Sequence, residues 1–186
     1  MSVTDEYRRE HGLTPETIAD TVLGFYARVG ERIAAIEASL KAKGIELRCQ
    51  KGCCGCCRDG LSMSEAEASV IRKLYPEVGK LEAHAVGSCP FLDAMGSCRI
   101  YEARPYICRT HGLPLRWFEE VEGDVDEDEV EVRDICELNA SVVDVVDLLA
   151  EDCWTMGLPE TQLALMNICA FGKDEVRISM RSFFEN

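Results

Sequence analysis

The feature that most constrains this chain is a cluster of five cysteines within nine residues, from Cys49 to Cys57. Gly52 and Gly55 lie among them, and the cluster has no regular apolar pattern. Packing and helix propensity do not explain so many sulfur atoms in one short segment. Thiolates are soft ligands for zinc and iron–sulfur clusters, and glycine lets a short loop fold back so that several sulfurs point inward. The sequence therefore predicts a metal-binding loop at residues 48–58.

Disulfides are a poor explanation for the cysteines as a whole. The chain has 186 residues and 11 cysteines, and an odd number cannot pair completely within one chain. A disulfide between sequence neighbours, such as Cys56 and Cys57, would be strained. The charged N-terminal residues lack the apolar core of a secretory signal, and no apolar run approaches the length of a membrane span. We therefore expect a reducing cytoplasm, where cysteine clusters more often serve metal binding or catalysis.

The charge of the chain narrows the choice of partners. The formal net charge is −14 at pH 7, and a strongly acidic protein is repelled by nucleic-acid phosphates and by anionic membrane surfaces. We therefore expect neither nucleic acid nor a membrane as a partner. The expected partner is a metal ion or a metal cluster, and the sequence identifies no protein partner.

A long amphipathic helix is predicted before the cysteine cluster. Apolar residues recur at spacings of three and four from Ile18 to Leu40, which places them along one face of a helix. Thr14 suits the N-cap, Pro15 the first helical position, and Gly44 the exit. We interpret this helix as a cover for the metal core, with a partner-binding or coiled-coil helix as the alternative.

Further helices are predicted after the cluster. Ser64 and Glu67 have the spacing of a capping box, and Pro76 would end the helix that they begin. Acidic and apolar residues alternate at helical spacing over 141–154, which predicts a helix there. Pro159 suits the start of another helix, running over 159–170.

The remaining segments are less regular. Cys89 and Cys98 flank a turn-like stretch that contains Gly96, which predicts a short hairpin or knuckle with the two cysteines near its base. The stretch 119–131 is mainly acidic and is expected to be a solvated excursion. The tail over 174–186 is compatible with a helix or a strand.

Together these patterns predict a mainly α fold. We expect a single helical domain over 1–186, built around an irregular cysteine-rich metal centre with at most a small hairpin. The metal-binding core is expected over about 45–140, with the acidic surface excursion at about 119–131. Helical flanks are expected over 14–44 and 141–186.

The cysteines fall into two classes by their local sequence. Cys153 and Cys169 lie within apolar helical patterns and are interpreted as small buried hydrophobic residues, whereas Cys54 is not assigned to either class. Eight others stand in loops or beside turn residues: Cys49, Cys53, Cys56, Cys57, Cys89, Cys98, Cys108 and Cys136. Eight thiolates could make two four-cysteine sites, or one larger site with spare thiols. Adjacent cysteines point in different directions, which favours a polynuclear centre or two nearby sites.

Basic residues lie beside the cysteines in sequence. Four thiolates on one zinc ion carry a net negative charge, so donors that hydrogen-bond to the sulfurs are needed. The candidates are Arg48, Lys51, Arg58, Arg99, Arg104 and Arg109, with ordinary surface residues as the alternative. His111 is a candidate auxiliary ligand or proton donor. Of these, Arg104, Arg109 and His111 are retained as the residues predicted to support a bound cofactor.

These motifs resemble a known family. The pattern Cys49-x3-Cys53-x2-Cys56-Cys57 is followed by Cys89-Pro-Phe-Leu-Asp, by Cys98-x-Ile-Tyr-Glu-Ala-Arg-Pro-x-x-Cys108-Arg and by Cys136-x-Leu-Asn. Together they resemble the CxxCxxCC cysteine-cluster family, the YkgJ-like group of zinc- or iron-chelating proteins. The resemblance covers about Cys49 to Asn139 and implies that the eight cysteines are the metal-binding set. More distantly, the chain resembles the flagellin lysine N-methylase, which implies an iron–sulfur centre.

The resemblance implies a cofactor but no reaction. We expect an iron–sulfur cluster, with [4Fe–4S] favoured, or zinc. The first functional hypothesis is a metal-binding protein in metal handling or electron transfer. The alternatives are an iron–sulfur-dependent group-transfer or redox enzyme similar to the methylase, and a structural zinc protein that acts as a binding module. No catalytic residue is identified, so enzymatic activity stays open.

Overall fold

The computed structural model describes residues 6, 8, 10, 12–121, 128–172 and 177–185. The chain divides into two compact units, each built from segments that are far apart in sequence. Unit 1 consists of Met1–Ala27, Lys51–Tyr106 and Thr161–Asn186, and unit 2 consists of Arg28–Gln50 and Ile107–Glu160. The single domain expected over 1–186 stays a prediction.

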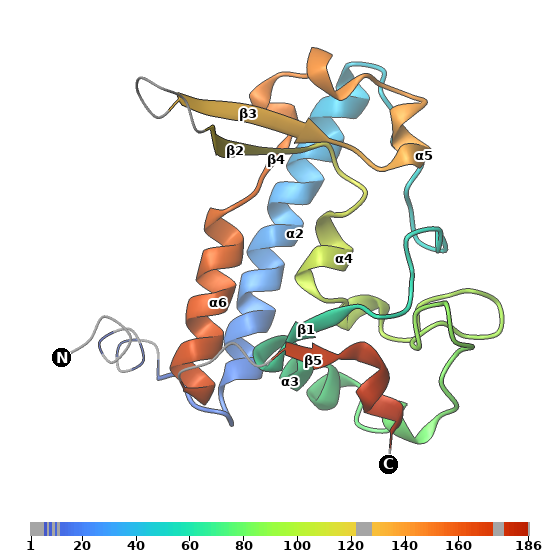
Figure 1. The fold of residues 1–186 in the computed structure, drawn as a ribbon, viewed down its shortest axis with the longest axis vertical. Helices are drawn as coiled ribbons and strands as arrows, with labels where there is room; N and C mark the ends of the chain where they lie inside the picture. The colour runs from blue at the N-terminus through green and yellow to red at the C-terminus, as the bar shows by residue number, and fades with distance from the viewer. Residues whose placement is uncertain are drawn as a thin grey trace. The chain divides into compact units, whose positions relative to one another are not determined.

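The fold is a mixed α/β fold, so the expected mainly α class is wrong. The described residues form helices and five strands, and the strands lie in two sheets (Figure 1). The helices are α2 (Ile18–Ala42), α3 (Glu65–Leu74), α4 (Tyr106–Thr110), α5 (Glu137–Ala140) and α6 (Leu158–Phe171). The 3-10 helices are η1 (Val78–Lys80), η2 (Tyr101–Ala103), η3 (Val145–Asp147), η4 (Ala150–Asp152) and η5 (Met180–Phe184). The strands are β1 (Ser62–Ser64), β2 (Leu115–Val121), β3 (Asp128–Asp134), β4 (Trp154–Thr155) and β5 (Arg177–Ser179).

Helix α2 confirms the amphipathic helix predicted before the cysteine cluster, but it begins at Ile18 rather than at the predicted Pro15. Its apolar stripe is buried, with Ile18, Val22 and Leu40 fully enclosed. It ends at Ala42, where Gly44 adopts a φ of 79° and the Ile45 N–H donates to the Leu40 carbonyl. No helix in the described part of the chain combines the length and apolarity that a membrane span needs.

Two other helices begin and end where their terminal residues predict. At α3, the Ser64 side chain accepts from the Glu67 N–H while the Glu67 side chain accepts from the Ser64 N–H, which completes the capping box. Helix α6 has Pro159 in its first turn. It is followed by Gly172, whose φ of 105° lets the chain turn out of the helix.

The two sheets account for the difference from the expected fold class. In unit 1, β1 and β5 pair antiparallel, with Met63 opposite Ile178. In unit 2, the strand order is β3-β2-β4, with β2 antiparallel to β3 and parallel to β4 (Figure 1). The three strands β1, β4 and β5 have only two or three residues, too few to show the alternation of a strand in the sequence.

The two ends of the acidic stretch 119–131, predicted as a surface excursion, lie in β2 and β3, and Glu119, Glu120 and Val130 are exposed. Residues 122–127 lie outside the described residues. One sequence prediction in unit 2 requires correction, because the helix predicted over 141–154 is replaced by η3, η4 and the start of β4. The Asp144 side chain accepts from the Val146 N–H, and such local hydrogen bonds compete with a continuing α-helix. The β-branched valines of this segment also disfavour helix.

A buried carboxylate links η4 to α2 within unit 2. Asp152 is fully buried, accepts a hydrogen bond of 2.7 Å from the Ser39 hydroxyl and forms an ion pair with Lys43. Burial by itself raises the pKa of Asp152, but the hydrogen bonds from Lys43 and Ser39 and the charge of Lys43 outweigh it. The pKa of Asp152 therefore lies below its usual value of 3.8.

We expect Asp152→Asn to destabilise unit 2 by about 2 kcal/mol at pH 7, because a charge-assisted bond is lost and Lys43 keeps no carboxylate partner there. Because the folded pKa is lowered, the contribution of the carboxylate is fully present above pH 3.8 and is lost as pH falls through the folded value. Urea denaturation at pH 7 and at pH 3, followed by tryptophan fluorescence, measures this. Both tryptophans, Trp117 and Trp154, lie in unit 2. An equal gap between the two proteins at both pH values would contradict the prediction.

Candidate metal centre

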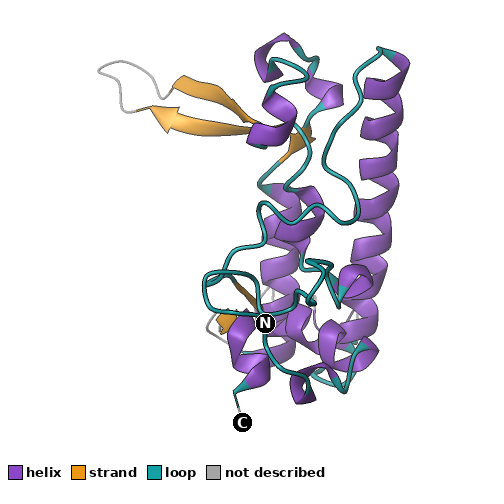
Figure 2. Cartoon of the chain, turned by 90° about the vertical axis from the view of Figure 1, so that its right-hand side faces the viewer, coloured by secondary structure: helices purple, strands orange, loops and turns teal. Residues whose placement is uncertain are grey.

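The eight predicted cysteine ligands divide between the two units. Unit 1 contains Cys53, Cys56, Cys57, Cys89 and Cys98, and unit 2 contains Cys49, Cys108 and Cys136. None of the 11 cysteines, all of which lie in described segments, forms a disulfide. The segment between α2 and β1, which carries the first cluster, is mostly loop (Figure 2).

In unit 1 the first cysteine cluster is folded into successive tight turns. The Cys57 N–H donates to the Cys54 carbonyl at 3.0 Å, and the Arg58 N–H donates to the Cys56 carbonyl at 2.9 Å. Gly52 has a φ of 97°, a conformation that favours glycine and reverses the chain just before Cys53. Cys53, Cys56 and Cys57 are all partly exposed, so their sulfurs lie near the surface rather than in the apolar core.

Backbone pairing brings the second cysteine group of unit 1 to the first. The Cys89 N–H donates to the Cys57 carbonyl at 2.9 Å, and Arg58 and Ser88 form an isolated antiparallel bridge. A second bridge joins Leu92 to Cys98 and closes the predicted knuckle. Cys57, Cys89 and Cys98 come from three turns, and main-chain hydrogen bonds hold these turns in one region.

Cys89 and Cys98 occupy equivalent positions in their turns. Burial raises the pKa of both thiols, but in each case a backbone N–H two residues later opposes the rise by donating to the sulfur, Phe91 for Cys89 and Ile100 for Cys98. Backbone donors of this kind stabilise a thiolate. The negative charge of an ionised Cys98 also raises the pKa of Cys89. A bound cation would relieve that repulsion, and its binding would release protons.

Cys54, which the sequence left unassigned, lies against the knuckle. A Cβ built on Gly96 would stand 3.5 Å from the Cys54 sulfur, so this sulfur lies over the turn that separates Cys89 from Cys98. Cys54 is the one exposed cysteine of the chain.

In unit 2 one buried side chain ties together the three segments that carry cysteines. Asn139 has no exposed surface. Its Oδ1 accepts from the backbone N–H groups of Arg48 at 2.6 Å and Cys49 at 3.3 Å, while its Nδ2 donates to the Gly112 carbonyl at 2.7 Å. Asn139 lies in α5, three residues after Cys136, and Gly112 lies four residues after Cys108. The amide therefore fixes the local positions of the segments bearing Cys49, Cys108 and Cys136.

The contact between Gly112 and Cys49 explains why glycine occupies that position. A Cβ on Gly112 would stand 2.6 Å from the Cys49 sulfur and 2.8 Å from its Cβ. Any larger residue would displace the Cys49 side chain. The close approach matches the hydrogen bonds of Asn139, which draw the same two segments together.

The basic residues predicted to support the sulfurs have different surroundings. The Arg104 guanidinium stacks 3.7 Å from the ring centroid of Tyr101, and its charge helps to lower the pKa of Cys98 against the effect of burial. Lys51 also lies over the Tyr101 ring, at 4.8 Å. Arg99 instead donates to the Glu82 carbonyl, and Arg48 donates to the Ser141 hydroxyl. Arg104 was predicted to support the sulfurs, and its charge acts on one of them, the thiol of Cys98.

Arg109 and His111 lie at the end of α4 and beyond it. Arg109 is in the last turn of this helix, and the His111 N–H donates to the Ile107 carbonyl at 3.1 Å. The His111 residue is exposed. The roles predicted for Arg109 and His111 stay predictions.

The side chains are not arranged as a completed metal site. Among the described residues, no three His, Cys, Asp or Glu side chains are grouped closely enough to hold a metal ion. The donor chemistry nevertheless fits zinc or an iron–sulfur cluster, since soft thiolates with backbone N–H donors are what these groups require. Metal binding would have to draw the sulfurs of each group closer together.

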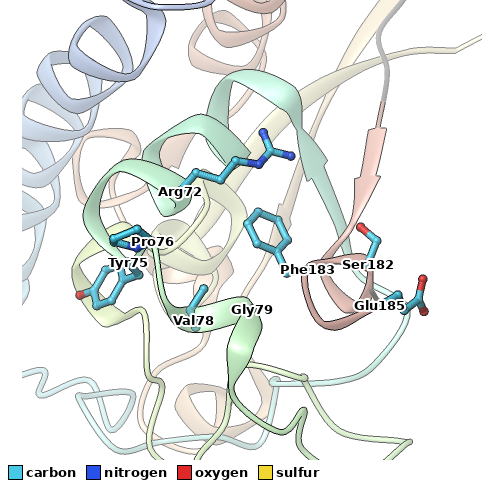
Figure 3. Close-up of a pocket in the computed structure, with 8 residues that line it drawn as sticks. All are labelled: Arg72, Tyr75, Pro76, Val78, Gly79, Ser182, Phe183 and Glu185. Carbon is cyan, nitrogen blue, oxygen red and sulfur yellow. The ribbon is translucent and has the colours of Figure 1, made fainter.

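A pocket of about 280 Å³ lies elsewhere in unit 1, between the end of α3, η1 and η5 (Figure 3). Its lining includes Arg72, whose guanidinium lies 5.3 Å from the ring centroid of Phe183. Gly79 faces the Phe183 carbonyl so closely that an added Cβ would clash with the carbonyl oxygen. None of the lining residues is a cysteine, so we do not assign this pocket to the metal centre.

Comparison with known proteins identifies the cysteine-bearing segment. Residues 48–137 match the model of the family CxxCxxCC, described as "Putative zinc- or iron-chelating domain". The match covers 90 of the 186 residues, just under half of the chain. The CxxCxxCC domain spans all eight predicted ligands, and the predicted family resemblance is confirmed. Searches of curated proteins and of solved structures gave no match.

The two cysteines outside the CxxCxxCC domain are core residues. Cys153 and Cys169 are both fully buried, which confirms their interpretation as small hydrophobic residues. Burial raises the pKa of the Cys153 thiol, which keeps it protonated. Cys169 lies in α6, whereas Cys153 precedes β4 rather than lying in a helix.

Three residues that organise the CxxCxxCC domain were not singled out by the sequence. Asn139 is part of the Cys136-x-Leu-Asn motif, but nothing local shows that its side chain is buried. Asp59 precedes Gly60, a pair typical of turns, and it accepts from the Gly87 N–H at 3.1 Å. Its partner Arg181 comes from η5, outside the matched segment, and no local pattern marks it.

Proposed function

We propose that the chain chelates iron as an iron–sulfur cluster, [4Fe–4S] by preference, through thiolates of its CxxCxxCC domain. The description of the matching family model is less specific and names only zinc or iron chelation. The proposal is carried by the main-chain hydrogen bond from Cys89 to Cys57, which gathers cysteines from separate turns of unit 1. The role that we propose is metal handling or electron transfer.

The ligand set of unit 1 supports a polynuclear centre. Cys56 and Cys57 are adjacent, so their side chains leave the backbone in different directions, and a cluster can use both more readily than one tetrahedral zinc ion can. Cys89 and Cys98 add two sulfurs that receive backbone N–H donors. Arg104 adds a positive charge close to Cys98, which partly offsets the negative charge of the thiolates.

We propose further that the protein works in a reducing cytoplasm. Its ligand thiols must stay reduced to bind metal, and none of the cysteines forms a disulfide.

Paired cysteine variants test the proposed ligands. We expect Cys89→Ser with Cys98→Ser to lose most of the bound metal after anaerobic purification, because serine does not replace a thiolate for iron or zinc. Cys169→Ala is the matched control, since this cysteine is buried in α6 and lies outside the CxxCxxCC domain. Metal content is measured by mass spectrometry of the elements. Full retention of metal in the double variant would remove these two cysteines from the ligand set.

A further inference from the structure

Arg181 uses its whole guanidinium group to join two turns of unit 1. Its Nε donates to both oxygens of the Asp59 carboxylate, at 2.9 and 3.0 Å, and its Nη2 lies 2.7 Å from Asp59 Oδ2. Its Nη1 and Nη2 also donate to the carbonyls of His84 at 3.2 Å and Ser88 at 3.1 Å. The planar fork of arginine can satisfy a carboxylate and two carbonyls together, whereas lysine cannot.

The two turns that Arg181 joins both carry predicted metal ligands. Asp59 follows Cys57 by two residues, and Ser88 immediately precedes Cys89. Asp59 also accepts from the Gly87 N–H at 3.1 Å. The carboxylate and the guanidinium therefore both contact the place where the turn after Cys57 meets the turn before Cys89, which we call the junction. The hydrogen bond between the Cys89 N–H and the Cys57 carbonyl lies at this junction.

The segment that bears Arg181 is itself docked onto unit 1. Strand β5 pairs with β1, and the Met180 N–H donates to the Leu61 carbonyl at 2.9 Å. The fully buried ring of Phe91, two residues after Cys89, packs on Phe183 and Phe184 with centroid distances of 5.5 and 5.2 Å. The C-terminal segment therefore contacts the chain after the first cysteine cluster and the chain around Cys89.

Arg181 also brings a permanent positive charge to this junction, because the guanidinium group of arginine stays protonated in proteins. Its hydrogen bonds to the carbonyls of His84 and Ser88 place that charge beside the turn that precedes Cys89, where thiolate charge would accumulate.

We propose that Arg181 is a positioning residue of the metal centre, and that the C-terminal segment 177–184 completes the ligand arrangement of unit 1 by fixing Cys57 and Cys89 relative to each other. This inference rests on the proposed function, because it concerns the same thiolates. It extends the metal-binding unit beyond the matched segment 48–137 to a part of the chain that carries no ligand.

Cobalt titration of the metal-free full-length chain under anaerobic conditions tests the proposal, since thiolate-bound Co²⁺ has a sulfur-to-metal absorption band. We expect Arg181→Gln to weaken Co²⁺ binding by about ten- to hundredfold. We expect Arg181→Lys to restore part of the affinity, because it keeps the charge but loses the fork. The matched control is Arg177→Gln, since Arg177 lies in the same segment and its guanidinium donates to Ser62 in β1.

The outcomes separate this inference from the proposed function. If the unaltered chain binds no Co²⁺ through thiolate, both fail. If the unaltered chain binds it and Arg181→Gln binds it equally well, the role of Arg181 alone is overturned.

Hydrogen exchange keeps the test decisive if Arg181→Gln is less stable overall. In the metal-free chain, the Cys89 amide should lose protection in this variant and keep it in Arg177→Gln, because its bond to the Cys57 carbonyl depends on the junction. Protection of the Cys89 amide in Arg181→Gln equal to that of the unaltered chain would also overturn the proposal.

Discussion

Replacing Asn139 by alanine is expected to lower the free energy of unfolding of unit 2 by about 3 kcal/mol. The substitution removes the acceptor of two backbone N–H groups and the donor to the Gly112 carbonyl, and it leaves a cavity at a fully buried position. It should also increase the reactivity of the Cys49 thiol toward alkylating reagents, since the segment that bears Cys49 loses its attachment. Urea denaturation followed by tryptophan fluorescence reports on unit 2, which contains both tryptophans.

Two variants sharpen the test of Asn139. Asn139→Asp keeps the acceptor oxygen but brings a carboxylate against the Gly112 carbonyl, so we expect a loss of stability there too. Asn167→Ala is the control, because Asn167 is equally buried but accepts only from the Ala66 N–H, in unit 1. Unchanged stability and unchanged Cys49 reactivity in Asn139→Ala would show that the amide does not organise these segments.

The second large effect is expected at Glu67, a buried carboxylate of unit 1. Its oxygens accept from the Tyr26 hydroxyl at 3.1 Å, from both the N–H and the hydroxyl of Ser64 at 3.0 Å, and from the Tyr106 N–H at 2.8 Å. We expect Glu67→Ala to cost about 4 kcal/mol, because it leaves several buried donors without an acceptor. Circular dichroism in urea measures the loss of stability, and hydrogen exchange should show faster exchange at the Ser64 and Tyr106 amides.

Glu65→Ala is the matched control for Glu67. Glu65 lies in the first turn of the same helix, but its ion pair with Arg72 is partly exposed and contributes less than about 1 kcal/mol. Glu67→Gln should fall between the two, because its amide keeps one acceptor oxygen and turns an N–H₂ group toward donors. Equal stability of Glu67→Ala and Glu65→Ala would contradict the role assigned to Glu67.

The helices that could be predicted from the sequence are those with local determinants. These determinants lie inside the helix or within a few residues of its ends. They are the apolar stripe of α2, the Ser64–Glu67 capping box of α3, and Pro159 and Gly172 at the two ends of α6. The alternation of Val130 and Val132 with charged residues also indicated a strand, but the acidic composition of 119–131 obscured it. The helix expected over 141–154 failed because valine and aspartate favour other local conformations.

The sheets and the grouping of the cysteines depend on contacts between distant residues. Strand β1 forms because Ser62 meets Ser179, and a three-residue strand has no pattern of its own to reveal that partner. Spacing and family resemblance identified the cysteines as a set, but their grouping depends on contacts such as Cys89 to Cys57 and Asn139 to Cys49. Arg181 lies outside every motif, and only the fold brings its guanidinium to Asp59.

The most direct measurement is the metal and inorganic sulfide content of the full chain after anaerobic purification, together with its visible absorption. We expect iron and inorganic sulfide in equal amounts, a brown protein, and loss of both iron and sulfide when Cys89 and Cys98 are replaced by serine. A colourless protein with stoichiometric zinc would contradict the iron–sulfur assignment but would agree with metal chelation by the thiolates. A chain that holds neither metal under these conditions, and that takes up neither when supplied, would contradict the central claim that its cysteines form a metal centre.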